Sequence, residues 1–182
     1  MITKNDLRKK AKEIRNSLNV KEISEKIVAN ILKLETYKKA NHIMLFYPLG
    51  SEVDLRSLLN DDKKHFYLPK VNGKELLACP YKIGDDLVIS SFNTQEPTSI
   101  PINDTSILDI ILVPALMVDK KLNRLGYGGG FYDRFLSKQS SSSLKIVAIP
   151  QALIIDEIPM DDFDEFVDLI ITESTEIESA SS

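Results

Sequence analysis

The segment that decides the fold reads "LDIILVPALMVDKKLNRLGYGGGFYDRFLSK" and spans residues 108–138. It opens with an apolar run, residues 108–114, which is the strongest buried-strand signal in the chain. Four of the seven glycines of the chain fall within residues 126–130, and the residues after them repeat apolar side chains at helical spacing. A second apolar run follows at residues 144–150. This order of strand, glycine loop, helix and strand predicts a parallel α/β unit.

The rest of the chain adds helices and strands that suit such a unit. Residues 4–18 carry apolar side chains at helical spacing, which predicts an amphipathic helix. Asn19, with Glu22 three residues later, predicts the N-cap of a second helix. Further strands are expected at residues 42–48, 65–69, 75–81 and 167–172.

Length and composition fit a single domain. With 182 residues and 43% hydrophobic content, the chain is long enough to bury a sizeable core. We expect one domain over residues 1–173, on which the helical segment 1–40 packs, and a disordered tail over residues 174–182. The one cysteine, Cys79, excludes an intramolecular disulfide, and the longest apolar run is too short to span a bilayer. We therefore expect a cytoplasmic monomer without membrane contact.

Charge is distributed unevenly along the chain. The formal net charge of -4 argues against a general nucleic-acid binder. Residues 1–40 nevertheless carry eleven Lys and Arg against five Asp and Glu. On the first predicted helix, Lys4, Arg8 and Arg15 form a basic stripe that borders the apolar face. Such a stripe can bind an anion or can be a solvated helix face, and its position alone does not decide between the two.

The glycine loop has the chemistry of a phosphate site. Glycine lacks Cβ, so successive N–H groups can approach a ligand closely, and a helix N-terminus adds further donors. Arg124 stands just before the loop, and Asp133 falls in the first helical turn, where it could hold a divalent cation against a phosphate. The loop lacks the Gly-Lys-Ser/Thr of a Walker A loop, and Phe131 stands where a dinucleotide fingerprint needs glycine. The alternative is a tight turn, but four glycines flanked by these residues favour a ligand loop.

Other polar residues are weaker candidates when taken alone. Glu52 and Asp54 follow the first predicted strand, where α/β proteins place functional groups, but a turn acid and a helix N-cap are equally good interpretations. The acidic segment before the last strand contains Asp161, Asp162, Asp164, Glu165 and Asp168. Such acidic loops are usually only solvated, but one of these carboxylates could complete a Mg²⁺ site with Asp133. His42 and His65 have no ligand partner at recognisable spacing, so we expect them to be structural.

The glycine loop resembles the signature of a known family. "RLGYGGGFYDRFL" (residues 124–136), preceded by "VPALMVD" (residues 113–119), is similar to the signature of 5-formyltetrahydrofolate cyclo-ligases, also called 5,10-methenyltetrahydrofolate synthetases. The likeness extends over nearly the whole chain in the right order. The further matching segments are "KNDLR" (4–8), "FYPLGSEVD" (46–54), "YLPKV" (67–71), "QEP" (95–97) and "IPQALIIDEIPMDDFDEFVDLIITE" (149–173).

The resemblance implies a fold and a reaction. The fold of this family is a three-layer α/β/α arrangement around a mixed, mostly parallel, Rossmann-like sheet. Its enzymes use ATP and Mg²⁺ to convert 5-formyltetrahydrofolate into 5,10-methenyltetrahydrofolate, releasing ADP and phosphate, in one-carbon folate metabolism. In the family's mechanism the formyl oxygen attacks the γ-phosphate, and N10 then closes the ring onto the formyl carbon. Such chemistry needs positioning and charge neutralisation more than a protein nucleophile.

The resemblance also implies an ATP-binding set. Lys4 and Arg8 would contact the phosphates, which favours the anion-binding interpretation of the basic stripe. The ATP loop would comprise Arg124, Leu125, Gly126, Tyr127, Gly128, Gly129, Gly130, Phe131 and Tyr132. Within this loop, residues 127–131 would also line the reacting formyl group.

The resemblance also implies which residues bind the folate, hold the metal and take part in catalysis. Tyr47 and Glu52 would face the folate, with Glu52 accepting hydrogen bonds from the pterin. Asp133 and Asp164 would hold Mg²⁺. The catalytic residues would be Arg124, Tyr132 and Asp133.

Two positions depart from the pattern of the family. Some members have a lysine where Gly129 stands, so the phosphate charge here would be met by the other basic residues and the metal. Phe163 replaces the usual histidine before the C-terminal aspartate, which leaves the choice of Asp164 among its acidic neighbours open. Two rival functions also stay open: another phosphate-handling α/β protein, such as a sugar-phosphate isomerase relative, and a non-catalytic nucleotide- or folate-binding module.

Overall fold

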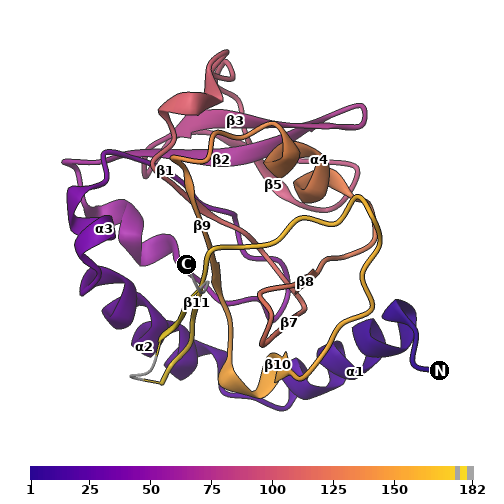
Figure 1. Cartoon of the computed structure of the whole chain (residues 1–182). Helices are drawn as coiled ribbons and strands as arrows, with labels where there is room; N and C mark the ends of the chain where they lie inside the picture. Colours follow the sequence, from indigo (N-terminus) through magenta and orange to yellow (C-terminus); the bar gives the residue numbers. More distant parts are fainter. Residues whose placement is uncertain (175–176, 180–182) are drawn as a thin grey trace.

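The centre of the molecule is a mixed β-sheet, seen in a computed structural model that describes residues 1–174 and 177–179 (Figure 1). In spatial order the strands of this sheet are β12 (Ile177–Ser179), β11 (Leu169–Ile171), β9 (Leu144–Ala148), β6 (Ile110–Leu112), β1 (His42–Met44), β2 (His65–Asn72) and β3 (Glu75–Tyr81). Neighbouring strands from β11 to β2 pair in parallel, whereas β12 and β3 pair antiparallel at the two edges. The predicted mixed, mostly parallel sheet is confirmed.

Helices and smaller sheets surround these strands. The helices are α1 (Lys4–Asn16), α2 (Val20–Leu32), α3 (Glu35–Lys39) and α4 (Phe131–Ser137), with short 3₁₀ turns at η1 (Arg56–Asn60), η2 (Thr105–Ile107) and η3 (Gln151–Leu153). The smaller sheets, in spatial order, are β10 (Ile154–Ile155), β7 (Met117–Asp119) and β8 (Arg124–Leu125), and the hairpin β4 (Leu87–Ile89) with β5 (Gln95–Pro97). Across the described residues, no helix combines the length and the apolar character needed to cross a bilayer.

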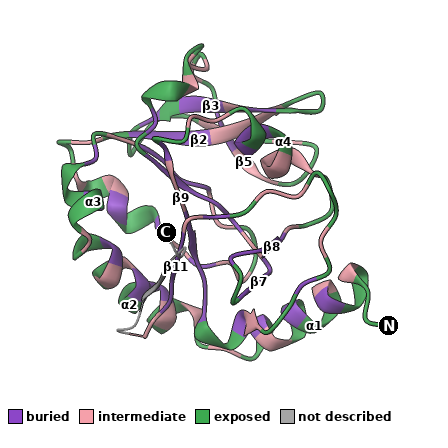
Figure 2. Ribbon diagram, viewed as in Figure 1, coloured by how far each residue is buried: buried purple, intermediate pink, exposed green. Residues whose placement is uncertain are grey.

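Three layers result because side chains alternate along each central strand. Ile43 belongs to a buried cluster with Ile27 of α2, on the face that α2 and α3 cover. The next residue, Met44, belongs to a second cluster with Leu7 of α1 and Phe135 of α4. Figure 1 shows α2 and α3 on one side of β9 and β11, with α4, β7 and β8 on the other. Figure 2 shows buried residues on these strands and exposed residues on the outer faces of the helices.

The local signals of the sequence correspond to real element boundaries. Asn19 caps α2, since its side chain accepts a hydrogen bond from the backbone N–H of Glu22 at 3.2 Å. The turn that contains Gly73 joins β2 to β3, and Gly73 has a φ of +64°. β1 is shorter than predicted and ends at Met44, because the chain after it leaves the sheet to line a cavity.

The C-terminal segment differs from the disordered tail predicted over residues 174–182. Ile177–Ser179 form β12, which pairs antiparallel with β11. The apolar edge of β11 offers unpaired backbone groups, and a returning strand satisfies them. Residues 175–176 and 180–182 lie outside the described part of the chain.

The order of the strands creates a crevice at one end of the sheet. The chain runs from β1 to its neighbour β2, and it reaches β6, on the other side of β1, only after β3, β4 and β5. The segments that leave the carboxyl ends of β1 and β6 therefore diverge. In open α/β sheets such a switch point is where ligands bind.

Candidate functional site

A cavity of about 660 Å³ lies at this switch point. Its walls come from α1, the segment after β1, the β2–β3 pair, the β4–β5 hairpin, the glycine loop with the start of α4, and the acidic segment before β11. Segments far apart in sequence therefore share one hollow. The volume lies within the range of small-molecule and cofactor sites.

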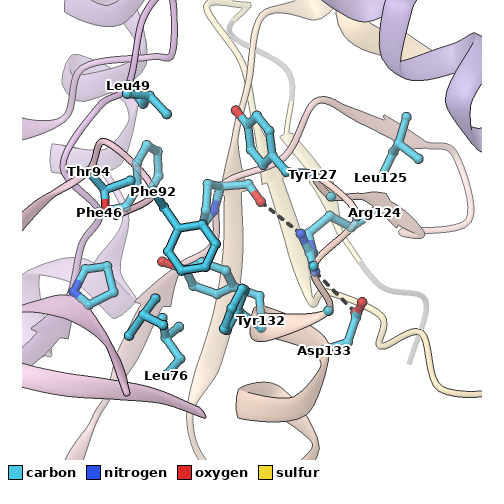
Figure 3. A pocket seen from close by; sticks show the side chains of 18 of the residues that line it. Phe46, Leu49, Leu76, Phe92, Thr94, Arg124, Leu125, Tyr127, Tyr132 and Asp133 are labelled. Atoms are coloured by element: carbon cyan, nitrogen blue, oxygen red, sulfur yellow. Dashed lines mark hydrogen bonds and ion pairs between the residues drawn. The ribbon is translucent and has the colours of Figure 1, made fainter. Parts of the chain in front are cut away.

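Arg124 fixes both ends of the glycine loop (Figure 3). Its side chain is only 4% exposed, so its charge needs partners. Nη1 donates to the carbonyl of Pro114 at 3.1 Å, and Nη2 donates to Oδ1 of Asp133 at 3.2 Å. The guanidinium also lies 5.8 Å from the ring centre of Tyr132. Asp133 Oδ1 accepts a further bond from the backbone N–H of Glu165 at 3.1 Å, which ties the acidic segment to α4.

The backbone of the loop explains why glycine is needed. Gly128 and Gly130 have φ values of +106° and +71°, in the left-handed region that favours glycine. A Cβ on Gly126 would lie 2.8 Å from Nη1 of Arg124. Arg8 of α1 reaches the same place, where its Nε donates to the carbonyl of Gly126 at 2.9 Å. The loop is therefore enclosed by two guanidinium groups.

The start of α1 pairs with the acidic segment. Lys4 Nζ donates to Asp161 Oδ2 at 2.7 Å and also to Asp164 Oδ2. Burial alone would raise the pKa of Asp164, but the hydrogen bonds from Lys4 and from the backbone N–H of Asp161 lower it below its ordinary value. Asp164 is therefore held as a carboxylate.

A second network joins α1 to the segment after β1. Tyr127 Oη donates to Glu52 Oε2 at 2.7 Å, and the backbone N–H of Leu49 donates to Oε1 at 2.7 Å. Arg15 donates through Nη1 to Tyr127 Oη at 3.0 Å and through Nε to Ser51 Oγ at 2.8 Å. Burial raises the pKa of Glu52 above its ordinary value, although these hydrogen bonds and Arg15 oppose the rise. Burial and the nearby Glu52 carboxylate also raise the pKa of Tyr127.

Two buried polar atoms at the cavity lack partners among the described residues. They are Nε of Arg124 and the hydroxyl of Tyr132. Most buried polar atoms of native proteins are hydrogen-bonded, so such atoms call for an explanation. The lining offers an anionic ligand the positive charge of Arg124, whereas these two atoms are enclosed by the protein.

The sequence profile of the 5-formyltetrahydrofolate cyclo-ligase family matches residues 1–173. The chain belongs to this family. The cyclo-ligase of Mycoplasma genitalium is 30% identical over 178 residues, which cover 94% of this chain and 98% of that protein. The cyclo-ligase of Haemophilus influenzae is 28% identical over 160 residues, or 81% of this chain and 84% of that protein.

Solved structures of cyclo-ligase relatives have the same fold. The 5,10-methenyltetrahydrofolate synthetase of Aquifex aeolicus superposes with a TM-score of 0.87 at 30% identity, covering 100% of this chain and 94% of that chain. The synthetase of Mycoplasma pneumoniae superposes with a TM-score of 0.77 at 23% identity, covering 95% and 100% of the two chains. The second likeness concerns the fold alone.

The cavity gathers the residues for which the sequence predicts a cyclo-ligase site. Those that line it are Lys4, Arg8, Tyr47, Glu52, Arg124, Leu125, Gly126, Tyr127, Gly128, Gly129, Gly130, Phe131, Tyr132, Asp133 and Asp164. Their functional roles stay predictions. Asp54 lies outside the lining and pairs with Arg56 at 2.8 Å, so its structural interpretation holds. His42 and His65 also lie outside and stack at 4.9 Å.

The structure narrows the choice among the C-terminal acids. Asp161 and Asp164 line the cavity, whereas Asp162 and Asp168 do not. Asp168 instead accepts a hydrogen bond from the backbone N–H of Lys145 at 2.8 Å, next to β9. Phe163, at the position of the family's usual histidine, is 88% exposed. Asp161 and Asp164 therefore both stay candidates for the proposed metal site.

Carboxylate oxygens in this cavity suit a hard cation. In the described part of the chain, no three or more His, Cys, Asp or Glu side chains are grouped to hold a metal by themselves. Mg²⁺ is commonly held by one or two carboxylates together with phosphate oxygens and water. Asp133 and Asp164 fit that donor set.

Sequence reasoning missed several residues of the cavity. The sequence places Arg15 on the basic stripe, but its contacts with Ser51 and Tyr127 depend on tertiary structure. The sequence marks Glu96 only as part of the "QEP" segment and gives no signal for Phe92, yet both line the cavity. The short β4–β5 hairpin that carries them gave no clear periodic pattern.

Replacing Tyr127 with Phe should raise the pKa of Glu52 further. The hydroxyl of Tyr127 donates a hydrogen bond that stabilises the ionised carboxylate of Glu52. Without this bond the protonated form of Glu52 becomes more favourable, and the pKa rises. The measurement is a pH titration of the Glu52 carboxyl resonance by NMR. Tyr81→Phe, a buried tyrosine elsewhere, is the control. An unchanged or lower pKa in Tyr127→Phe would contradict the network.

Proposed function

We propose that this protein catalyses the ATP- and Mg²⁺-dependent cyclisation of 5-formyltetrahydrofolate to 5,10-methenyltetrahydrofolate. The observation that carries the proposal is that phosphate-binding and folate-facing residues of the family line one cavity. Membership of the family supports the proposal, as does the similarity over most of their length to relatives named 5-formyltetrahydrofolate cyclo-ligase.

The proposed phosphate end of the cavity consists of α1, the glycine loop and the acidic segment. Lys4, Arg8 and Arg124 supply cations, and glycines without Cβ let the phosphates approach the backbone closely. The guanidinium of Arg124 lines this end and adds positive charge next to the place proposed for the phosphates.

The charges at this end support a requirement for a divalent cation. The three cations face three carboxylates, those of Asp133, Asp161 and Asp164. A triphosphate would therefore add uncompensated negative charge. In our proposal Asp133 and Asp164 would hold Mg²⁺, which would supply part of the missing positive charge and polarise the phosphate oxygens. Lys4, now paired with Asp161 and Asp164, would then be available to phosphate.

The segment after β1 forms the proposed folate end of the cavity. Tyr47 and Glu52 line it, and Glu52 is held in place by Tyr127 and the backbone N–H of Leu49. Each carboxylate oxygen still has a lone pair for an N–H of the pterin. Tyr127 belongs to the glycine loop, so the folate end and the phosphate end share one rigid connection.

The chemistry needs these two substrates to meet in one orientation. The formyl oxygen attacks the γ-phosphorus, and the bond to ADP breaks. N10 then attacks the activated formyl carbon, loses its proton, and inorganic phosphate leaves with the former formyl oxygen. Each step depends on alignment and charge stabilisation rather than on a protein nucleophile. The cavity offers both, which suits a site without a reactive Cys or His.

Purified protein mixed with 5-formyltetrahydrofolate, ATP and Mg²⁺ should form the methenyl product. The measurement is its near-ultraviolet absorbance, with ADP release followed in parallel. Reactions without ATP and reactions with EDTA are the controls, and their absorbance should not change. Substrate binding without any product or ADP would contradict the proposal and favour a non-catalytic binding module.

Asp133→Asn should lower kcat/KM by about 100-fold or more, because the amide loses the charge that holds the cation but still accepts hydrogen bonds from Arg124. The matched control is Asp162→Asn, which removes a carboxylate from the neighbouring acidic segment at a position outside the cavity lining. The control should retain wild-type kinetics. Equal activity of the two variants would remove Asp133 from the proposed metal site.

A further inference from the structure

One buried carboxylate at the cavity has no place in the proposed mechanism. Glu96 of β5 is 6% exposed and lines the cavity. Its Oε2 accepts a hydrogen bond from the backbone N–H of Val71 at 2.8 Å. Among residues 1–174 and 177–179, no cation forms an ion pair with Glu96, and Oε1 has no hydrogen-bond partner.

Such a group leaves one oxygen free to accept a hydrogen bond from a ligand. A buried carboxylate normally pairs with a cation or accepts several hydrogen bonds, because otherwise its lost hydration is not replaced. Glu96 has one backbone donor, and its second oxygen is left for whatever fills the cavity. A ligand with an N–H group would complete its hydrogen bonding.

The surroundings of Glu96 suit a planar ring. The chain leads from Phe92 through Thr94 to Glu96, and the ring of Phe92 meets that of Phe131 edge to face at 5.5 Å. Val71 and Leu76 add apolar surface to the same lining. Aromatic and apolar walls with one precisely placed acceptor are typical of heterocycle sites.

The position of this wall relative to the proposed phosphate end bears on which of the two substrates would lie against it. In the view of Figure 3, Phe46, Leu49 and Thr94 lie on the side of the cavity opposite Arg124 and Asp133. In phosphoryl transfer the γ-phosphate lies between the leaving ADP and the attacking oxygen. If the adenosine part of ATP extends from the phosphate end away from the β4–β5 hairpin, the substrate that carries the attacking formyl oxygen lies on the side of this hairpin.

We propose that Glu96 is a folate-binding residue whose Oε1 accepts a hydrogen bond from an N–H of the reduced pteridine ring. This inference rests on the proposed function. The ring of 5-formyltetrahydrofolate has N–H donors at its exocyclic amine, at N3 and at N8, so Glu52 and Glu96 can each accept from a different donor. The pair would select reduced pteridines with free ring N–H groups.

The test measures the binding of each substrate alone by calorimetry. Glu96→Gln keeps an oxygen for the N–H of Val71 and replaces the free acceptor with a donor. We expect the Kd for 5-formyltetrahydrofolate to rise about tenfold, and the Kd for ATP with Mg²⁺ to stay within about twofold of wild type. Glu75→Gln, an exposed glutamate of β3, is the matched control and should leave both constants unchanged.

Three outcomes would overturn the inference. They are an unchanged folate Kd in Glu96→Gln, a loss of ATP affinity instead, which would place adenine at this wall, and an equal loss for both substrates, which would indicate a purely structural role. If the variant fails to fold, the wild-type protein gives the answer. Its Glu96 carboxyl NMR resonance should shift with 5-formyltetrahydrofolate and not with ATP.

The same measurements separate this inference from the proposed function. Folate binding is measured without ATP and without turnover. A wild-type protein that binds folate through Glu96 but forms no methenyl product would contradict the cyclisation proposal alone. A productive enzyme in which Glu96→Gln binds folate normally would contradict the Glu96 inference alone.

Discussion

The buried guanidinium of Arg124 is the interaction on which the rest of the site depends. A side chain with 4% exposure must find partners for its charge, and it finds them in the Pro114 carbonyl after β6 and the Asp133 carboxylate in α4. These contacts fix the two ends of the glycine loop. The position of this guanidinium also explains why residue 126 is glycine, because a Cβ added there would lie 2.8 Å from Nη1 of Arg124. The residue that shapes the loop is therefore also a donor for the proposed phosphate.

Helix α1 completes this arrangement and accounts for the basic N-terminal segment of an acidic protein. Arg8 holds the carbonyl of Gly126, Arg15 holds the hydroxyl of Tyr127, and Lys4 holds Asp164. One short helix thus connects the glycine loop, the segment after β1 and the acidic C-terminal segment. Those three segments come from different parts of the chain, and two hydrogen bonds and one ion pair from α1 connect them at the border of the cavity.

The sequence predicts the parts of the structure that depend on local pattern or on a long motif. Apolar runs locate the strands, Asn19 marks the start of α2, and the glycine loop leads to the family. It does not predict features that need distant partners. β12 pairs with β11 although its composition resembles a tail, and the burial of Glu96 depends on Val71, 25 residues away. Strands of two or three residues, such as β8, also carry too little periodicity to be recognised.

In the proposed reaction, the cavity brings the formyl oxygen of the folate into contact with the terminal phosphorus of ATP. The most direct measurement uses 5-formyltetrahydrofolate labelled with ¹⁸O in the formyl group, followed by mass spectrometry of the inorganic phosphate formed with the methenyl product. The label should appear in phosphate, one atom per turnover. Unlabelled phosphate, with the ¹⁸O found in water, would contradict it.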